Sequence, residues 1–224
     1  MSLLRIAILG AGKVGGTLGR KWIQAGHTVA FGVTNPSGDR AESLRQEFGS
    51  RVSIGLPVEA LAESDVVLLA VPGNVVEEVI ATYASLLDHK IILDAANKYR
   101  NGSNRNYATQ NPQWNEPELN SLSFIQAHAP HAHAYRAFNS YSIHPFADPI
   151  YQGVQADLFY CGPAGEEKAI VEQLITEVGL RPIYLGENTM VEVVDGVIRL
   201  WAALAFYQEK GVDNVAFKVL TRSE

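Results

Sequence analysis

Apolar residues in this chain form short runs that alternate with stretches of helical periodicity. The runs have the length of buried β-strands and cover residues 3–9, 27–33, 52–54, 65–71, 90–95, 134–138, 157–161 and 181–185. Apolar positions three and four residues apart predict a helix that begins after residue 12 and further helices over 40–49, 58–63, 74–87, 118–129, 166–178, 188–210 and 214–220. Strands that alternate with helices favour parallel pairing through right-handed crossovers. The pattern therefore predicts an α/β fold with a mainly parallel sheet.

A glycine-rich turn ends the first predicted strand. Gly10, Gly12 and Gly15 have the spacing G-x-G-x-x-G between a strand and a helix, which is the context of a dinucleotide-binding signature. Gly10 makes the tight turn, Gly12 lets the backbone approach a pyrophosphate, and Gly15 lets the helix pack closely on the strand. The backbone N–H groups at the start of the helix favour negative charge. The turn predicts a Rossmann doubly wound sheet that binds a dinucleotide.

The tip of the second predicted strand bears on the choice between NAD and NADP. An acidic residue at this tip hydrogen-bonds the 2′-hydroxyl of NAD, whereas a basic or hydroxyl-rich loop accommodates the 2′-phosphate of NADP. The tip has no carboxylate, and its side chains that can donate to a phosphate are those of Thr34, Asn35, Ser37 and Arg40. The same residues are typical of a turn and a helix N-cap, but we favour NADP.

The ends of three later strands complete the predicted cleft. Ligands in open α/β sheets bind outside the carboxyl ends of the strands, so residues at these ends are candidates for cofactor contact. These residues are Ala70, Val71, Pro72, Asn97, Phe138 and Asn139. A polar cluster over 139–142 lies where we expect the nicotinamide.

Composition and charge narrow the class of protein. The 224 residues are 47% hydrophobic and 19% charged, as in an ordinary globular protein. A net charge of −6 gives no basic surface for nucleic acid or an anionic membrane. Cys161 is the single cysteine and lies in an apolar run, which indicates a buried structural thiol. No run approaches the roughly 20 apolar residues of a transmembrane helix. We therefore expect a cytoplasmic protein that binds neither nucleic acid nor a membrane.

The chain divides at a change in composition. Residues 98–117 are rich in Asn, Gln, Ser and Pro with little periodicity, which predicts a long loop over the active-site side. We expect an NADP-binding domain over 1–150 and a smaller αβ extension with a long helix over 151–224, a small helical C-terminal part. The alternative is that both parts form one compact domain.

Several of these motifs carry a family resemblance that covers nearly the whole chain. The matching segments are residues 10–15, 31–33, 69–72, 93–97, 136–140, 159–162, 200–206 and 216–218. They include the Ala-Phe-Asn-Ser block at 137–140 and the Trp-containing helix at 200–206. With these segments the chain resembles the NADPH-dependent oxidoreductases related to coenzyme F420:NADP oxidoreductase. The resemblance implies NADP(H) as cofactor and a homodimer. It also implies a small-molecule partner that accepts the hydride, either a flavin, F420 or another small acceptor.

The resemblance also implies roles for individual residues. At the pyrophosphate it implies Gly12, Lys13 and Val14, and at the adenosine end Thr34, Asn35 and Arg40. At the nicotinamide side it implies Val71 and Pro72, with Asn97, Phe138 and Asn139 nearby. Many relatives carry an arginine where Thr34 stands, so Arg40 becomes the main candidate partner of the 2′-phosphate.

Few residues in the sequence indicate a catalytic role. Hydride transfer needs closeness and orientation more than an acid or a base. His144 is the candidate catalytic residue, because it follows the polar cluster and is able to donate a proton to a reduced acceptor. His128, His131 and His133 fall in a turn, where we expect solvated residues and no metal site. The alternatives are a non-catalytic NADP-binding sensor and a reductase of a small imine or hydroxyacid.

Overall fold

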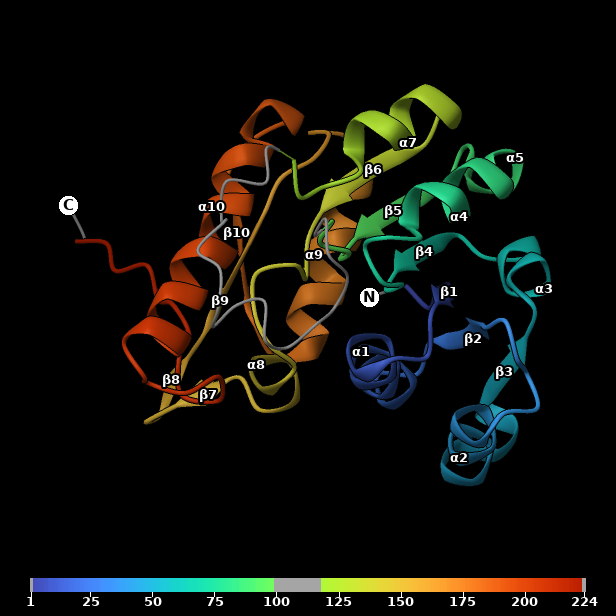
Figure 1. Ribbon diagram of the computed structural model, residues 1–224, viewed down its shortest axis with the longest axis horizontal. Helices are drawn as coiled ribbons and strands as arrows, with labels where there is room; N and C mark the ends of the chain where they lie inside the picture. Colours follow the sequence, from blue (N-terminus) through green and yellow to red (C-terminus); the bar gives the residue numbers. More distant parts are fainter. Residues whose placement is uncertain (1, 99–117, 223–224) are drawn as a thin grey trace.

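Six parallel strands form the sheet on which the chain is built, in the order β3-β2-β1-β4-β5-β6 (Figure 1). The strands are β1 (Arg5–Leu9), β2 (Thr28–Gly32), β3 (Val52–Gly55), β4 (Val66–Leu69), β5 (Ile91–Asp94) and β6 (His133–Arg136). Every neighbouring pair is parallel. The strand order reverses between β1 and β4, and ligands bind at the carboxyl ends of the strands at such a switch point. The predicted Rossmann α/β fold is confirmed.

The computed structural model describes residues 2–98 and 118–222, and the structural statements below concern these residues. The loop expected over 98–117 lies outside the described residues except for Lys98.

Helices cover both faces of the sheet. The helices that follow the strands are α1 (Lys13–Gln24), α2 (Asp39–Phe48), α3 (Pro57–Ala62), α4 (Val76–Thr82), α5 (Ala84–Leu87) and α7 (Leu122–His128). Side chains on successive residues of a strand point to opposite faces, and β1 shows this alternation. Ile6 and Ile8 belong to the core shared with α1 and α2. Ala7 and Leu9 belong to the core under α3, α4, α5 and α7.

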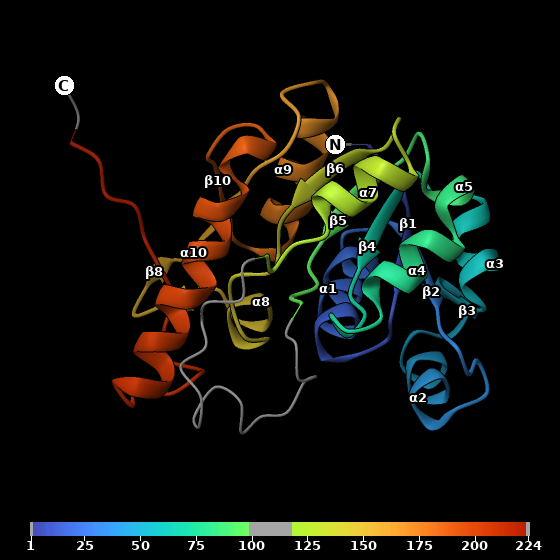
Figure 2. The same cartoon turned by 45° about the horizontal axis from the view of Figure 1, so that its top comes forward.

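The C-terminal part adds a small parallel pair, β9 (Asp157–Tyr160) with β10 (Arg181–Tyr184), joined by α9 (Glu167–Val178). A single antiparallel bridge between Arg136 and Cys161 attaches this pair to the edge of the main sheet. Helix α9 contacts α1, where the indole of Trp22 donates to the carbonyl oxygen of Leu174 at 3.1 Å. Helix α10 (Val191–Ala202) contacts β9. It lies at the end of the molecule opposite α2 (Figure 2). A small helical C-terminal part is therefore present.

Some local predictions were wrong. The helix expected over 74–87 is split into α4 and α5 at Tyr83, and the apolar spacing continues through this break without marking it. The helix expected over 188–210 is a 3-10 turn, η2 (Asn188–Met190), then α10, then a π-helical turn, η3 (Ala203–Tyr207). No helix forms over 214–220, because this backbone bonds to other elements. The N–H of Asp157 donates to the carbonyl of Phe217 at 2.9 Å, and the N–H of Val219 donates to the Asp157 carboxylate at 2.6 Å.

Four short elements were not predicted. They are the 3-10 turn η1 (Gly49–Arg51), helix α8 (His144–Ala147) and the hairpin of β7 (Ile150–Tyr151) with β8 (Val154–Gln155). Elements of two to four residues are too short for a periodic pattern to mark. Among the described residues, no helix has the length and apolar character needed to cross a membrane.

Candidate nucleotide-binding site

The glycine turn between β1 and α1 is packed tightly on two sides. Gly10 has a positive φ of 102°, and a Cβ there would lie 2.6 Å from the carbonyl oxygen of Ala70. A Cβ at Gly15 would overlap the carbonyl oxygen of Gly10 and lie 2.9 Å from the side chain of Ile8. Since neither position has room for a side chain, only glycine allows the turn and the close approach of helix to strand.

Gly12 differs from its two neighbours in the motif, because it faces open space. A Cβ at Gly12 would meet no described atom within 4 Å. Gly12 is the N-cap of α1, and no side chain in the described chain caps its first-turn N–H groups. The first turn also lacks acidic residues. The N–H groups at Lys13 and Val14 thus have the partial positive charge and the clear approach that a diphosphate needs.

A cleft of about 720 Å³ opens beside this turn. Its volume lies within the ordinary range of small-molecule and cofactor sites. The predicted residues that line it are Gly10, Gly12, Thr34, Asn35, Arg40, Val71 and Pro72. The same lining includes residues that sequence reasoning did not single out, namely Pro57, Val75, Glu78, Val79, Thr82 and Tyr83. Most of these lie on α3, α4 or the break after α4, and nothing in the local pattern marks them as facing a cavity.

The adenosine end of the cleft is formed by the loop between β2 and α2. The side chain of Asn35 accepts a hydrogen bond from the N–H of Ser37 at 3.2 Å, which fixes this loop as an Asx turn. Ser37 contributes this backbone group and is not among the residues that line the cleft. Arg40 lies in the first turn of α2 and lines the cleft as well as an adjoining hollow of about 400 Å³.

Two arginines border that adjoining hollow, and they differ in their partners. The guanidinium of Arg20 is bonded at 2.7 Å to each carboxylate oxygen of Glu47. Arg40 makes no ion pair with the described part of the chain. Arg40 is therefore the cation at this end whose guanidinium is available to a ligand phosphate.

Beyond Val71 and Pro72, the segments that follow β4 and β5 pack tightly against each other. A Cβ at Gly73 would overlap the carbonyl oxygen of Asn97, so glycine at this position lets the segment after Pro72 pack on the segment after β5. The side chain of Asn97 donates to the carbonyl oxygen of Asn139 at 3.0 Å, which adds the end of β6 to the same group. The structure thus brings the three predicted strand ends together.

Phe138 and Asn139 follow β6, and the side chains of both residues are buried. Phe138 has a φ of 61° and is 1% exposed, and its ring packs edge-on against Trp22 and Phe146. Asn139 is also 1% exposed and donates to the carboxylate of Asp195 at 3.1 Å. Both side chains are therefore occupied by the interior.

A buried arginine, which sequence reasoning missed, bonds to residues at the carboxyl ends of these strands. The guanidinium of Arg136, at the end of β6, donates to Asp195 Oδ1 at 2.8 Å and lies 3.1 Å from Asp94 Oδ2. Arg136, Asp94 and Asp195 are all fully buried. A second guanidinium nitrogen donates to Asn97 Oδ1 at 2.5 Å. Arg136 therefore fixes the orientation of Asn97 and connects the strand ends to α10.

The carboxylates of this network are held by further donors. Asp94 Oδ2 accepts from the N–H of Ser121 at 2.7 Å, and Asp195 Oδ2 accepts from the side chain of Asn120 at 3.0 Å. Burial raises the pKa of Asp94, and the nearby charge of Arg136 opposes that rise. With two carboxylates to one guanidinium, the network depends on these neutral donors for its remaining hydrogen bonds.

Two other residues singled out from the sequence lie elsewhere. His144 begins α8, is not among the residues that line the cleft, and pairs through Nε2 with Asp213 Oδ1 at 2.6 Å. Cys161 is fully buried, and burial raises the pKa of its thiol to about 12, so the thiol stays protonated and unreactive at neutral pH. The expectation of a buried structural thiol is confirmed.

The sheet order and the glycine turn define the fold as a Rossmann α/β fold, and a known family matches part of the chain. Residues 5–98 match the model of the family described as NADP oxidoreductase, coenzyme F420-dependent. The resemblance read from the sequence is confirmed over this segment.

Solved structures with the same fold cover most of the chain. A candidate F420-dependent NADP reductase from Arthrobacter sp. FB24 is 22% identical, with a TM-score of 0.77 over 97% of this chain and 100% of that one. A protein of unassigned function from Sinorhizobium meliloti is 24% identical, with a TM-score of 0.63 over 83% and 86% of the two chains. An imine reductase from Aspergillus terreus in complex with NADPH4 is 18% identical, with a TM-score of 0.61 over 91% and 62%. These likenesses establish a shared fold.

Proposed function

We propose that this protein is an NADP(H)-dependent oxidoreductase that transfers hydride between the nicotinamide and a small acceptor, with a flavin or a deazaflavin such as F420 as the first choice. The observation that carries the proposal is the uncapped start of α1 at Gly12, open to a cleft that has an available arginine at its far end. The match of residues 5–98 to the F420-dependent family supports the same choice of cofactor and acceptor.

Each end of the cleft has a distinct role in this proposal. The first-turn N–H groups of α1 bind the diphosphate, and the guanidinium of Arg40 binds the 2′-phosphate in a planar, bidentate contact. Val71 and Pro72 provide an apolar wall that excludes water from one side of the cofactor. The nicotinamide, when bound, supplies the hydride, and the protein supplies position and electrostatics.

The strand ends support this positioning role. Asn97 is held by Arg136 on one side and by the backbone of Asn139 on the other. A side chain fixed from two sides keeps its orientation without a catalytic acid or base nearby. This arrangement suits a reaction whose rate depends on closeness and alignment of the donor and acceptor rings.

The test combines cofactor binding with turnover. Purified protein is titrated with NADPH, then incubated with NADPH and F420, FMN, FAD or riboflavin while the absorbance of the reduced nicotinamide is followed. Oxidation of NADPH with at least one of these ring systems is the expected result. Tight NADPH binding without turnover of any acceptor would contradict the enzymatic proposal and favour a sensor. Absence of NADPH binding would contradict both.

A further inference from the structure

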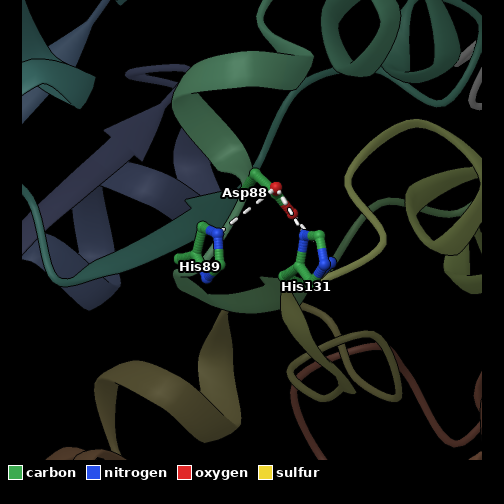
Figure 3. Close-up of side chains that lie close together, drawn as sticks. All are labelled: Asp88, His89 and His131. Carbon is green, nitrogen blue, oxygen red and sulfur yellow. Dashed lines mark hydrogen bonds and ion pairs between the residues drawn. The ribbon is translucent and has the colours of Figure 1, made fainter.

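Three side chains of types that can bind a metal lie close together at the amino ends of strands β5 and β6 (Figure 3). Asp88 and His89 lie in the turn between α5 and β5, and His131 lies in the turn between α7 and β6. These turns lead into the amino ends of two neighbouring strands, whereas the cleft lies at carboxyl ends. The cluster is therefore separate from the proposed nucleotide site.

One carboxylate joins the two turns. Asp88 Oδ1 accepts a hydrogen bond from the backbone N–H of His131 at 2.7 Å, which clamps the turns together independently of the imidazole rings. The other oxygen, Oδ2, lies 2.9 Å from Nδ1 of His131 and 3.7 Å from Nε2 of His89. The candidate ligand atoms of the three residues all lie within 4.8 Å of one another. A backbone contact thus holds one oxygen in place and leaves the other facing both rings.

His89 occupies an unusual backbone conformation. Its φ is 60°, in the left-handed region that favours glycine. With histidine in this conformation, the ring stacks on that of His131 with centroids 4.7 Å apart and an interplanar angle of 2°. Strained non-glycine residues gather at functional sites, because there the side chain is needed in spite of the conformation. The positive φ of His89 therefore indicates a functional site at the same cluster as the distances between the ligand atoms do.

The local charge suits a cation. With neutral imidazoles, the cluster carries the single negative charge of Asp88. Two cations that line the neighbouring hollow are directed elsewhere: Lys90 donates to the carbonyl oxygen of Ser64, and Arg5 pairs with Asp65 at 2.7 Å. Two imidazoles and a carboxylate are ligands typical of Zn²⁺, Co²⁺ and Ni²⁺, and three protein ligands leave a position for water.

We propose that Asp88, His89 and His131 bind one divalent transition-metal ion of the zinc class. The ion takes the place of the contact between Asp88 Oδ2 and Nδ1 of His131; a ligating nitrogen must be unprotonated, so the neutral His131 ring then carries its one proton on Nε2. A metal ion lies in the plane of each imidazole that binds it, so at least one of the two parallel rings turns on binding. The side chains of His89 and His131 are 76% and 63% exposed, and their rotation meets little packing. The bound ion pins the α5–β5 turn to the α7–β6 turn.

The test uses untagged protein treated with a chelator and then dialysed. Isothermal titration with Zn²⁺ measures stoichiometry and affinity, and the visible spectrum of the Co²⁺ form reports the ligand geometry. We expect one equivalent of Zn²⁺ to bind, with a rise in the melting temperature because the ion binds the folded state. The affinity for NADPH stays unchanged, which separates this result from the test of the oxidoreductase proposal.

Two variants and a matched control make the test specific. His89→Gly removes a ligand and relieves the positive φ, so the variant folds at least as well without metal. His89→Gly and His131→Ala each weaken Zn²⁺ binding by at least about tenfold. His128→Ala, which removes an exposed histidine bonded to the carbonyl of Phe124 on α7, leaves binding unchanged. Failure of the original protein to bind Zn²⁺ would overturn the proposal, and so would binding by both ligand variants as tight as that of the original protein.

Discussion

Arg136 and Asp195 form a fully buried ion pair, 2.8 Å between Nε and Oδ1, that joins the edge strand of the main sheet to helix α10. The pair connects residues 59 positions apart in the chain. Through the same guanidinium, α10 is connected to Asn97 at the proposed nicotinamide end. Helix α10 therefore contributes to the stability of the strand ends as well as to the small C-terminal part.

Arg136→Met tests how much the fold depends on this guanidinium. The substitution leaves Asp94 and Asp195 buried without a positive partner, and we expect the free energy of unfolding to fall by about 3–5 kcal/mol. Chemical denaturation at neutral pH measures the change. Arg5→Met is the control, because the pair of Arg5 with Asp65 is about half exposed and its loss changes stability much less. Equal effects of the two substitutions would contradict the role given to Arg136.

Arg40→Ala tests the preference for NADP. Removal of the guanidinium eliminates the proposed contact with the 2′-phosphate, so NADPH binding weakens by about ten- to a hundredfold while NADH binding changes little. Affinities for both nucleotides are measured by titration. Arg51→Ala removes a cation that lies 5.8 Å over the ring of Phe48 and does not line the cleft. It serves as the control for net charge. Similar losses for NADPH and NADH would refute the assignment.

The carboxylate of Asp157 gives the C-terminal segment a pH-dependent attachment. Burial raises the pKa of Asp157, but hydrogen bonds from Arg181, the N–H of Val219 and Lys218 outweigh this, and the net pKa is lowered. A lowered pKa means that the stabilisation is fully present above the ordinary Asp value of about 3.9 and is lost as the pH falls through the folded-state pKa. Asp157→Asn should therefore be less stable than the original protein at neutral pH, with a difference that shrinks below about pH 4.

Denaturation curves of both proteins at several pH values measure this difference. Glu63→Gln, which removes an exposed carboxylate, is the control and should show little effect at any pH. A stability difference that stays constant down to pH values well below 4 would show that the charge of Asp157 does not hold the segment.

His144 is the candidate catalytic residue that the structure places against the C-terminal segment. Its Nε2 is bonded to Asp213, and the neighbouring Ser142 donates to the carbonyl oxygen of Val212 at 2.9 Å. We expect His144→Ala to leave both NADPH affinity and the rate of acceptor reduction within about twofold of the original values, since less than 0.5 kcal/mol of binding or activation free energy would be lost. Steady-state kinetics with the best acceptor provide the measurement. A large fall in kcat with unchanged NADPH affinity would instead make His144 a proton donor.

The sequence predicted the features that depend on local pattern. The alternation of Ile6 and Ile8 with Ala7 and Leu9 follows from burial of both faces of β1, and the apolar run was sufficient to find it. The tight turn at Gly10 and the close packing at Gly15 follow from steric rules that a short motif records. The parallel pairing of the main sheet follows from the regular alternation of strands and helices.

The features that sequence reasoning missed depend on contacts between distant residues. Asp195 resembles an ordinary polar residue of an amphipathic helix, yet it is fully buried because Arg136, Asn120 and Asn139 all donate to it. Likewise, the turn residue His131 meets Asp88 from a position 43 residues away. The residues next to Asp88 and His131 in the sequence do not mark either one, because the two side chains meet only when β5 and β6 pair.

The central claim is that the open start of α1 binds the diphosphate of NADP(H), and a single added methyl group tests it. In Gly12→Ala the new Cβ meets no described atom and φ stays at −64°, so the fold is retained while the methyl group occupies space proposed for the phosphate. In the control, Gly16→Ala, the Cβ lies within α1 at an ordinary 3.6 Å from Arg20. We predict that titration with NADPH shows at least a tenfold weaker affinity, about 1.4 kcal/mol, for Gly12→Ala and little change for Gly16→Ala. Unchanged NADPH affinity in a folded Gly12→Ala protein would contradict the account.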